Sequence, residues 1–215
     1  MKIEIWSDYV CPFCYIGKRR LEEALASTNL TDKAEVAFKA FQLDPNTPVD
    51  TEALMLDGLA QKYNVSLGEA EKMMANVSEQ AKTVGLTYNV DEMKAANTFN
   101  AHRLAKLAEK EGKGAAVSER LLQGSFINGE ALGKEETLLT IAEEAGMSKD
   151  RVKNMFSSDE FADEVRSDIA EAGQIGVQGV PFFVINRKYA ISGAQPAEAF
   201  AEALLKVATE EGIQP

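Results

Sequence analysis

Strand-forming patterns stand at the two ends of this 215-residue chain, and a long helical stretch separates them. Residues 1–6 alternate apolar and polar side chains, and residues 35–41 do so again, which is typical of half-buried strands. Near the other end, the apolar run 181–185 is followed by a tight turn at Asn186 and Arg187, which predicts a β-hairpin. The predicted order is strand, helix, strand, helical block, hairpin and helix, so the chain belongs to the mixed α/β class.

Two helices are expected beside these strands. The first spans about residues 12–27, and Leu21, Ala24 and Leu25 are spaced to form its buried stripe. The last begins at Pro196, because proline is favoured in the first turn of a helix. Its buried stripe is expected to consist of Phe200, Leu204, Val207 and Ala208.

From about residue 51 to residue 173, one helix follows another. Ser66 and Glu69 have the spacing of a capping box, which predicts a helix start. Asp91 is expected to cap another helix. Ala, Glu, Lys and Met are frequent in this block, in agreement with helix propensity. Glycines expected to end helices are Gly85, Gly112, Gly146 and Gly173.

Cys11 and Cys14 lie just after the first predicted strand, where the first helix begins. The free N–H groups and the dipole at a helix N-terminus favour the thiolate form of the first cysteine. Cys14 follows by about one helical turn, so its sulfur can reach Cys11 and close a small disulfide. Pro12 costs little there, because its missing N–H would be unpaired anyway. We therefore predict that Cys11 is the attacking nucleophile and Cys14 the resolving thiol of a redox pair.

A structural disulfide and a zinc site are the alternatives for this cysteine pair. The chain shows neither a signal peptide nor the roughly 20 apolar residues that cross a bilayer, so a cytoplasmic location is expected. Cytoplasmic thiols are kept reduced, which disfavours a structural disulfide. A closed zinc site usually takes four ligands, and the chain holds two Cys and one His, so no metal is expected. A C-x-x-C at a strand-to-helix junction favours redox chemistry.

The charge of the chain restricts its partners. It carries 23 basic and 34 acidic residues, which gives a formal net charge of −11 with the histidine neutral. Such a surface repels phosphate backbones and anionic lipids, so neither nucleic acid nor a membrane is expected as a partner. The short basic run Lys18, Arg19 and Arg20 is interpreted as solvated helix surface.

Four stretches spread over the chain carry a family resemblance: Ser7–Gly17, Asn97–Leu104, Gly179–Phe183 and Ser192–Pro196. They resemble the DsbA-like branch of the thioredoxin superfamily, and within it the FrnE-like dithiol–disulfide isomerases. The resemblance implies an α/β, thioredoxin-like fold with a large inserted all-helical domain. Residues 1–44 and 174–215 would form the discontinuous thioredoxin-like domain and residues 45–173 the helical domain, with the redox pair facing the junction.

The resemblance also implies site residues. Pro181 matches the family's cis-proline beside the disulfide, where a cis peptide would expose the backbone of Val180 to a substrate strand. Related enzymes often bury a carboxylate six residues before the first cysteine, where it accepts the proton of the second thiol. Ile5 stands there instead, which leaves Asp8 as the nearby candidate, although it also fits a helix cap. Strongly oxidising relatives carry a His between their cysteines, and Phe13 cannot replace it. A potential nearer about −200 to −270 mV than about −120 mV is therefore expected.

His102 is the single histidine of the chain and lies on a helix predicted from Asp91 to Gly112. It shares a face of that helix with Thr98 and Lys106, at spacings of four residues. The resemblance implies that this stretch faces the active site. Two interpretations stay open, a hydrogen-bonded structural histidine at the domain junction or a side chain that tunes Cys11 or grips the substrate.

The predicted function is a thiol–disulfide oxidoreductase or isomerase that acts on protein or small-molecule disulfides. The redox-active disulfide serves in place of a cofactor, with glutathione or a dithiol as the candidate electron partner. Kappa-class glutathione transferases and 2-hydroxychromene-2-carboxylate isomerases share the implied architecture. They typically work with a single Ser or Cys, so Cys14 argues against them. A third hypothesis is a non-catalytic binding module or chaperone. The direction of electron flow and the oligomeric state are left open by the sequence.

Overall fold

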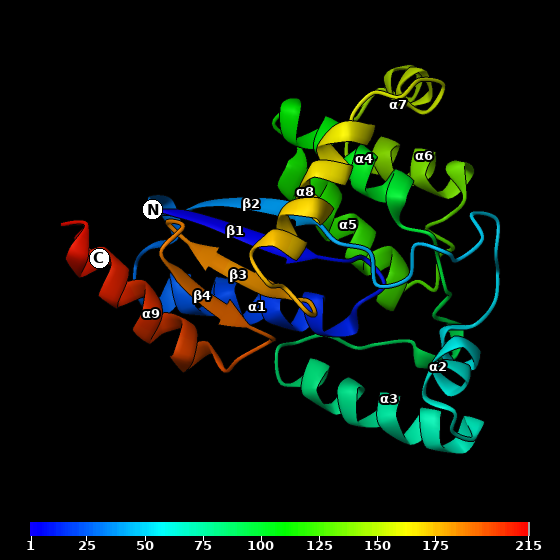
Figure 1. Ribbon diagram of the computed structural model, residues 1–215, viewed down its shortest axis with the longest axis horizontal. Coiled ribbons are helices and arrows are strands. Elements are labelled where there is room, and N and C mark those ends of the chain that lie inside the picture. The colour runs from blue at the N-terminus through cyan, green and yellow to red at the C-terminus, as the bar shows by residue number, and fades with distance from the viewer. Residues whose placement is uncertain (215) are drawn as a thin grey trace. The chain divides into compact units, whose positions relative to one another are not determined.

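The computed structural model describes residues 1–214, which form two compact units (Figure 1). The first unit is discontinuous and consists of Met1–Phe41 and the chain from Asp168 onward. The second unit is the continuous segment Gln42–Ser167. The division falls within helix α8 (Ala162–Gln174), so this helix contributes to both units.

A four-stranded sheet forms the centre of the first unit. Its strands are ordered β2-β1-β3-β4, with β1 parallel to β2 and antiparallel to β3. The strands are β1 (Lys2–Ser7), β2 (Glu35–Ala40), β3 (Phe182–Ile185) and β4 (Tyr189–Ser192). This arrangement confirms the predicted pair of early strands and the late hairpin.

The turn of the hairpin lies at the predicted position. Asn186 and Arg187 both have positive φ, 48° and 55° respectively. Two successive residues with positive φ are the mark of a type I′ turn, whose twist matches that of the flanking strands. The N–H of Lys188 then donates to the carbonyl of Ile185 at 3.0 Å and closes the turn.

Helices α1 (Pro12–Ser27) and α9 (Ala197–Glu210) pack on one face of the sheet. The core on this face contains Ile3, Ile5 and the predicted stripes of both helices, all buried. The rings of Phe183 and Phe200 meet edge to face there, with centroids 4.7 Å apart. The predictions for these two helices and their buried stripes are confirmed.

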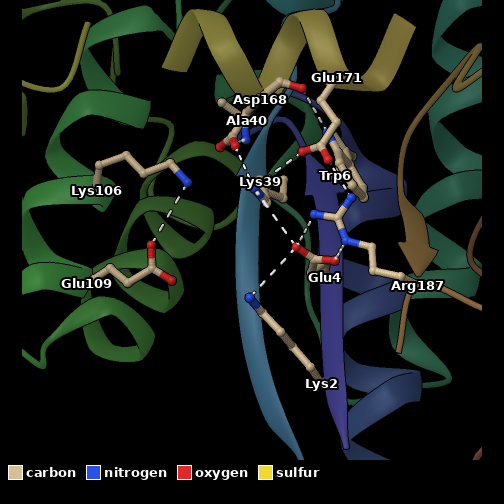
Figure 2. A network of polar contacts seen from close by, with 10 residues as sticks. All are labelled: Lys2, Glu4, Trp6, Lys39, Ala40, Lys106, Glu109, Asp168, Glu171 and Arg187. Atoms are coloured by element: carbon tan, nitrogen blue, oxygen red, sulfur yellow. Dashed lines mark hydrogen bonds and ion pairs between the residues drawn. The ribbon is translucent and has the colours of Figure 1, made fainter. Parts of the chain in front are cut away.

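The prediction that β1 is half-buried is wrong. Every residue of this strand except Lys2 is buried, including Glu4 and Trp6 on the polar face of the pattern. That face is covered by the part of α8 that belongs to the first unit, and Trp6 packs there with Ala172. Glu4 is buried because it is ion-paired with Arg187 (Figure 2). The alternation of apolar and polar residues predicted the strand correctly. It did not predict that α8 covers the second face, or that an ion pair allows Glu4 to be buried there.

The second unit is helical. Its complete helices are α2 (Met55–Tyr63), α3 (Leu67–Lys82), α4 (Phe99–Lys110), α5 (Gly114–Phe126), α6 (Glu135–Glu144) and α7 (Lys149–Phe156). The capping box is confirmed, because the Ser66 hydroxyl accepts from the N–H of Glu69 while the Glu69 carboxylate accepts from the N–H of Ser66. Short 3-10 turns lie at η1 (Thr31–Lys33) in the first unit and η2 (Val90–Glu92) in the second.

The helix predicted from Asp91 to Gly112 begins later than expected. Asp91 lies in η2 and caps no α-helix, and α4 starts at Phe99. The side chain of Asn97 accepts from the N–H of Phe99 at 3.1 Å and donates to the carbonyls of Pro45 and Thr47, about 50 residues earlier in the chain. Such side-chain bonds to the backbone compete with helix formation, which explains the delayed start.

Three of the four predicted helix-ending glycines are confirmed. Gly85, Gly112 and Gly146 follow α3, α4 and α6 and have positive φ. Gly173 lies inside α8, and Gly176 takes the left-handed conformation in its place, with φ 78°. None of the helices in the described part of the chain combines the length and the apolar composition that a membrane span requires.

Candidate active site

The two cysteines occupy the first turn of α1. Strand β1 ends at Ser7, and the N–H of Cys11 donates to the carbonyl of Asp8 at 3.0 Å, which turns the chain into the helix. Cys11 is the N-cap residue of α1, and Pro12 follows in its first turn. The N–H of Cys14 then donates to the carbonyl of Cys11 at 2.9 Å. Both thiols are free and buried, with exposed fractions of 5% and 3%.

The segment before β3 lies beside the first cysteine. The thiol of Cys11 donates to the carbonyl of Val180 at 3.3 Å. The peptide bond between Val180 and Pro181 is cis. Pro181 is buried and Val180 half-buried, and the carbonyl of Pro181 accepts from the N–H of Gly193 at 2.8 Å. The structure thus brings Cys11, Val180 and Pro181 together.

The environment of Cys14 keeps its sulfur protonated. Burial raises the pKa of the Cys14 thiol well above its usual range, and a hydrogen bond and the charge of Cys11 raise it further. Two weaker contacts act in the opposite direction and lower the pKa of Cys14, a hydrogen bond with the Ser7 side chain and one from the N–H of Asp8. At neutral pH the second sulfur is therefore a neutral thiol.

This raised pKa predicts a pH dependence of folding. Above about pH 8.5 the unfolded chain loses the Cys14 proton while the folded chain keeps it, so raising the pH lowers stability. The free energy of unfolding of the reduced protein should fall by up to about 1.4 kcal/mol per pH unit there. Cys14→Ser, which lacks this thiol but keeps Cys11, should lack this component. Urea unfolding at pH 7 and 9.5 measures the difference, and equal pH slopes for the two proteins would contradict the buried thiol.

The other residues predicted around the cysteine pair differ in their burial and in the unit to which they belong. Asp8 is 1% exposed, but the interpretation that it caps α1 is wrong because Cys11 is the N-cap residue. Ile5 lies in the core between the sheet and α1. Pro12 and Phe13 are half-buried. His102 lies in the helical unit, on α4, with an exposed fraction of 4%, and its role stays a prediction.

Three residues near the pair were not predicted. Ser7 contacts Cys14, as described above. Gly17 packs directly against Pro181. Arg20 was interpreted as solvated surface, which is wrong, because its guanidinium donates to the carbonyl of Ala194 at 2.5 Å. The available signal was local spacing, because Gly17 follows Cys14 by about one helical turn and Arg20 follows Gly17 by about one more.

The basic run contains a second departure from the predicted surface. Lys18 has an exposed fraction of 9%, and its amine bonds to the carboxylate of Glu22 at 2.5 Å. Arg19 bonds to the same carboxylate and to the hydroxyl of Tyr15.

Among residues 1–214, no group of three or more His, Cys, Asp or Glu side chains could hold a metal ion.

The chain was compared with known protein families and with solved structures. The family described as DSBA-like thioredoxin domain matches residues 2–205. A probable DsbA oxidoreductase from Streptomyces coelicolor is 39% identical, with a TM-score of 0.93 over 98% of this chain and 91% of that one.

Two other solved structures share the fold at low identity. A 2-hydroxychromene-2-carboxylate isomerase is 15% identical, with a TM-score of 0.72 over 99% of this chain and 98% of that one. The cytosolic disulfide reductase DsbM from Pseudomonas aeruginosa is also 15% identical, with a TM-score of 0.65 over 97% of this chain and all of that one. At this identity the likeness concerns the fold.

Proposed function

This chain belongs to the DSBA-like thioredoxin domain family, and we propose that it is a thiol–disulfide oxidoreductase that works through Cys11 and Cys14. The observation that carries the proposal is the placement of two free thiols in the first turn of α1, with the first beside the Val180 carbonyl. Burial keeps the second sulfur protonated, which leaves the first cysteine as the candidate for the attack.

The exchange proceeds in two displacements. The Cys11 thiolate attacks one sulfur of a substrate disulfide, a mixed disulfide forms, and the other substrate sulfur leaves as a thiolate. Cys14 then transfers its proton to the substrate thiolate released in the first step and attacks the Cys11 sulfur. The mixed disulfide breaks, the Cys11–Cys14 disulfide forms, and the second substrate thiolate leaves. The substrate gains two electrons, and a thiol donor such as glutathione or a dithiol must reduce the pair again.

The backbone of Val180 and Pro181 is proposed to contact the substrate, because the Val180 carbonyl lies 3.3 Å from the attacking sulfur. Phe13, half-buried between the cysteines, is proposed to border the same site. We also propose that Asp8 tunes the reactivity of the cysteine pair, and that His102 tunes Cys11 or binds the substrate. The fold-sharing reductase DsbM is described as cytosolic and has also been solved with glutathione. Glutathione disulfide is therefore the first small substrate to test, and we propose a cytoplasmic site of action.

The fold is shared with an isomerase that acts on 2-hydroxychromene-2-carboxylate, so the fold does not decide between the two chemistries. The presence of Cys14 does favour exchange, because a second thiol beside the first allows a mixed disulfide to be resolved. A non-catalytic binding role would leave the biological function intact when both cysteines are changed to Ser.

Trapping tests the proposal directly. Cys14→Ser removes the resolving thiol, so incubation with an oxidised substrate should accumulate a mixed disulfide on Cys11. Mass spectrometry of the intact protein should show the mass of one substrate half, removable by dithiothreitol, and the adduct names the substrate class. Cys11→Ser with Cys14 intact is the control and should form no adduct. Adducts on Cys14, or none in either variant, would contradict the assigned roles.

A further inference from the structure

Helix α1 contacts Pro181 one turn beyond the cysteine pair. The contact is made by Gly17, three residues after Cys14. A Cβ atom at Gly17 would lie 3.0 Å from Cγ of Pro181 and 3.1 Å from Cζ of Phe183. Carbon atoms in favourable contact are about 3.5–4.0 Å apart, so a methyl group does not fit without movement. The helix and the proline are as close as they are because residue 17 has no side chain.

The loop after β4 is tied to both partners of this contact. The N–H of Gly193 donates to the carbonyl of Pro181 at 2.8 Å. One residue later, the carbonyl of Ala194 accepts from the guanidinium of Arg20 on α1 at 2.5 Å. A continuous set of contacts therefore runs from α1 through this loop to the proline.

We propose that Gly17 and Arg20 are positioning residues that set the distance between Cys11 and the backbone of Val180 and Pro181. Gly17 permits the close approach of the helix, and Arg20 holds the loop that bonds to Pro181. The inference rests on the proposed function, in which this backbone contacts the substrate. It assigns a role in substrate binding to two residues that do not touch the sulfur atoms.

The backbone conformation at position 17 does not explain why a glycine stands there. Gly17 lies inside α1 and is not among the residues with positive φ, so its backbone suits any L-residue. In a helix interior, alanine is preferred to glycine. The close packing against Pro181 is thus the feature of the site that requires glycine, and Gly17→Ala should favour the helix while it displaces the proline.

Gly17→Ala separates a positioning role from a structural one. We expect a protein that still unfolds in one cooperative thermal transition, a KM for glutathione disulfide raised about tenfold, and a kcat within about twofold. The matched control is Gly58→Ala in α2, where a Cβ meets nothing within 4 Å, and it should leave KM unchanged. A wild-type KM in Gly17→Ala, or an equal rise in Gly58→Ala, would overturn the inference.

Alkylation provides a readout that does not depend on turnover. Displacement of Val180 should weaken the hydrogen bond from the Cys11 thiol, so iodoacetamide should modify reduced Cys11 several times faster in Gly17→Ala than in wild type. Absence of disulfide exchange in the wild type would refute the proposed function. An unchanged alkylation rate in Gly17→Ala would refute the positioning inference alone.

Arg20 has its own control on the same helix. Arg20→Ala should raise KM in the same direction, and Arg20→Lys should restore part of the loss, because an amine can still donate to Ala194. Arg19→Ala removes an equal charge from a residue that bonds to Glu22 and Tyr15 of α1, and it should leave KM unchanged. Equal KM values for Arg19→Ala and Arg20→Ala would overturn the assignment of Arg20.

Discussion

Cys11→Ser is expected to lower kcat/KM for disulfide exchange by about a thousandfold or more. A serine hydroxyl is not ionised near neutral pH and cannot form a disulfide, so the first displacement has no nucleophile. Cys14 is a poor replacement, because only its thiolate form could attack a substrate disulfide. That thiol is fully buried, and its raised pKa keeps it protonated. Reduction of insulin or of glutathione disulfide, followed with a coupled NADPH assay, measures the loss.

Cys14→Ser should behave differently from Cys11→Ser under the same conditions. The first displacement survives, so a burst of one substrate thiol per protein molecule is expected before turnover stops. Excess glutathione should release the mixed disulfide and restore part of the rate. Similar losses for both variants, with no burst in either, would show that the two sulfurs do not divide the work as proposed.

Local signals in the sequence predicted much of the frame around this site. The hairpin turn at Asn186 and Arg187 and the capping box at Ser66 depend on neighbours within a few residues, and both are confirmed. The cysteine pair at the start of α1 also follows from short-range order, because a strand ends and a helix begins within one turn. Such features are determined by backbone preferences that adjacent residues express.

Features that depend on distant partners were not predicted. Arg20 is one of three successive basic residues, and only the return of the chain near Ala194 distinguishes it from a surface residue. The side chain of Asn97 delays the start of the predicted helix and bonds to a loop about 50 residues before it in the chain. Glu4 has the place of a solvent-facing residue in the alternating pattern, but Arg187 lies beside it. Contacts between side chains so far apart in the chain leave no trace in the apolar and polar periodicity of the sequence.

Polar contacts on the second face of the sheet form a charge cluster (Figure 2). We define it as Glu4, Lys39, Asp168, Glu171 and Arg187. Burial lowers the pKa of Lys39, but the hydrogen bond and charge of Asp168, helped by Glu171, outweigh it and leave this pKa raised. The guanidinium of Arg187 lowers the pKa of Glu171. Each charge in this covered region therefore has an opposite charge beside it.

Asp168 joins three elements within the first unit. Its carboxylate accepts from the amine of Lys39 at 2.9 Å and from the buried N–H of Ala40 at 3.0 Å. Its backbone carbonyl accepts from the indole N–H of Trp6 at 2.9 Å. The C-terminal part of α8 is thereby bonded to both β1 and β2. An unpartnered N–H and a cation that has lost its nearest anion are both costly away from water.

Asp168→Ala is expected to lower the free energy of unfolding by about 3 kcal/mol. Asp168→Asn retains an acceptor for the N–H of Ala40 but loses the charge, so its loss should be smaller. Urea unfolding at pH 7 with Trp6 fluorescence measures both, because Trp6 is the one tryptophan of the chain and contacts Asp168. Glu79→Ala is the control, since its partner Lys82 lies on the exposed surface of α3 and the pair should contribute little. If Asp168→Ala unfolded at the same urea concentration as Glu79→Ala, the charge cluster would not be what holds α8 against the sheet.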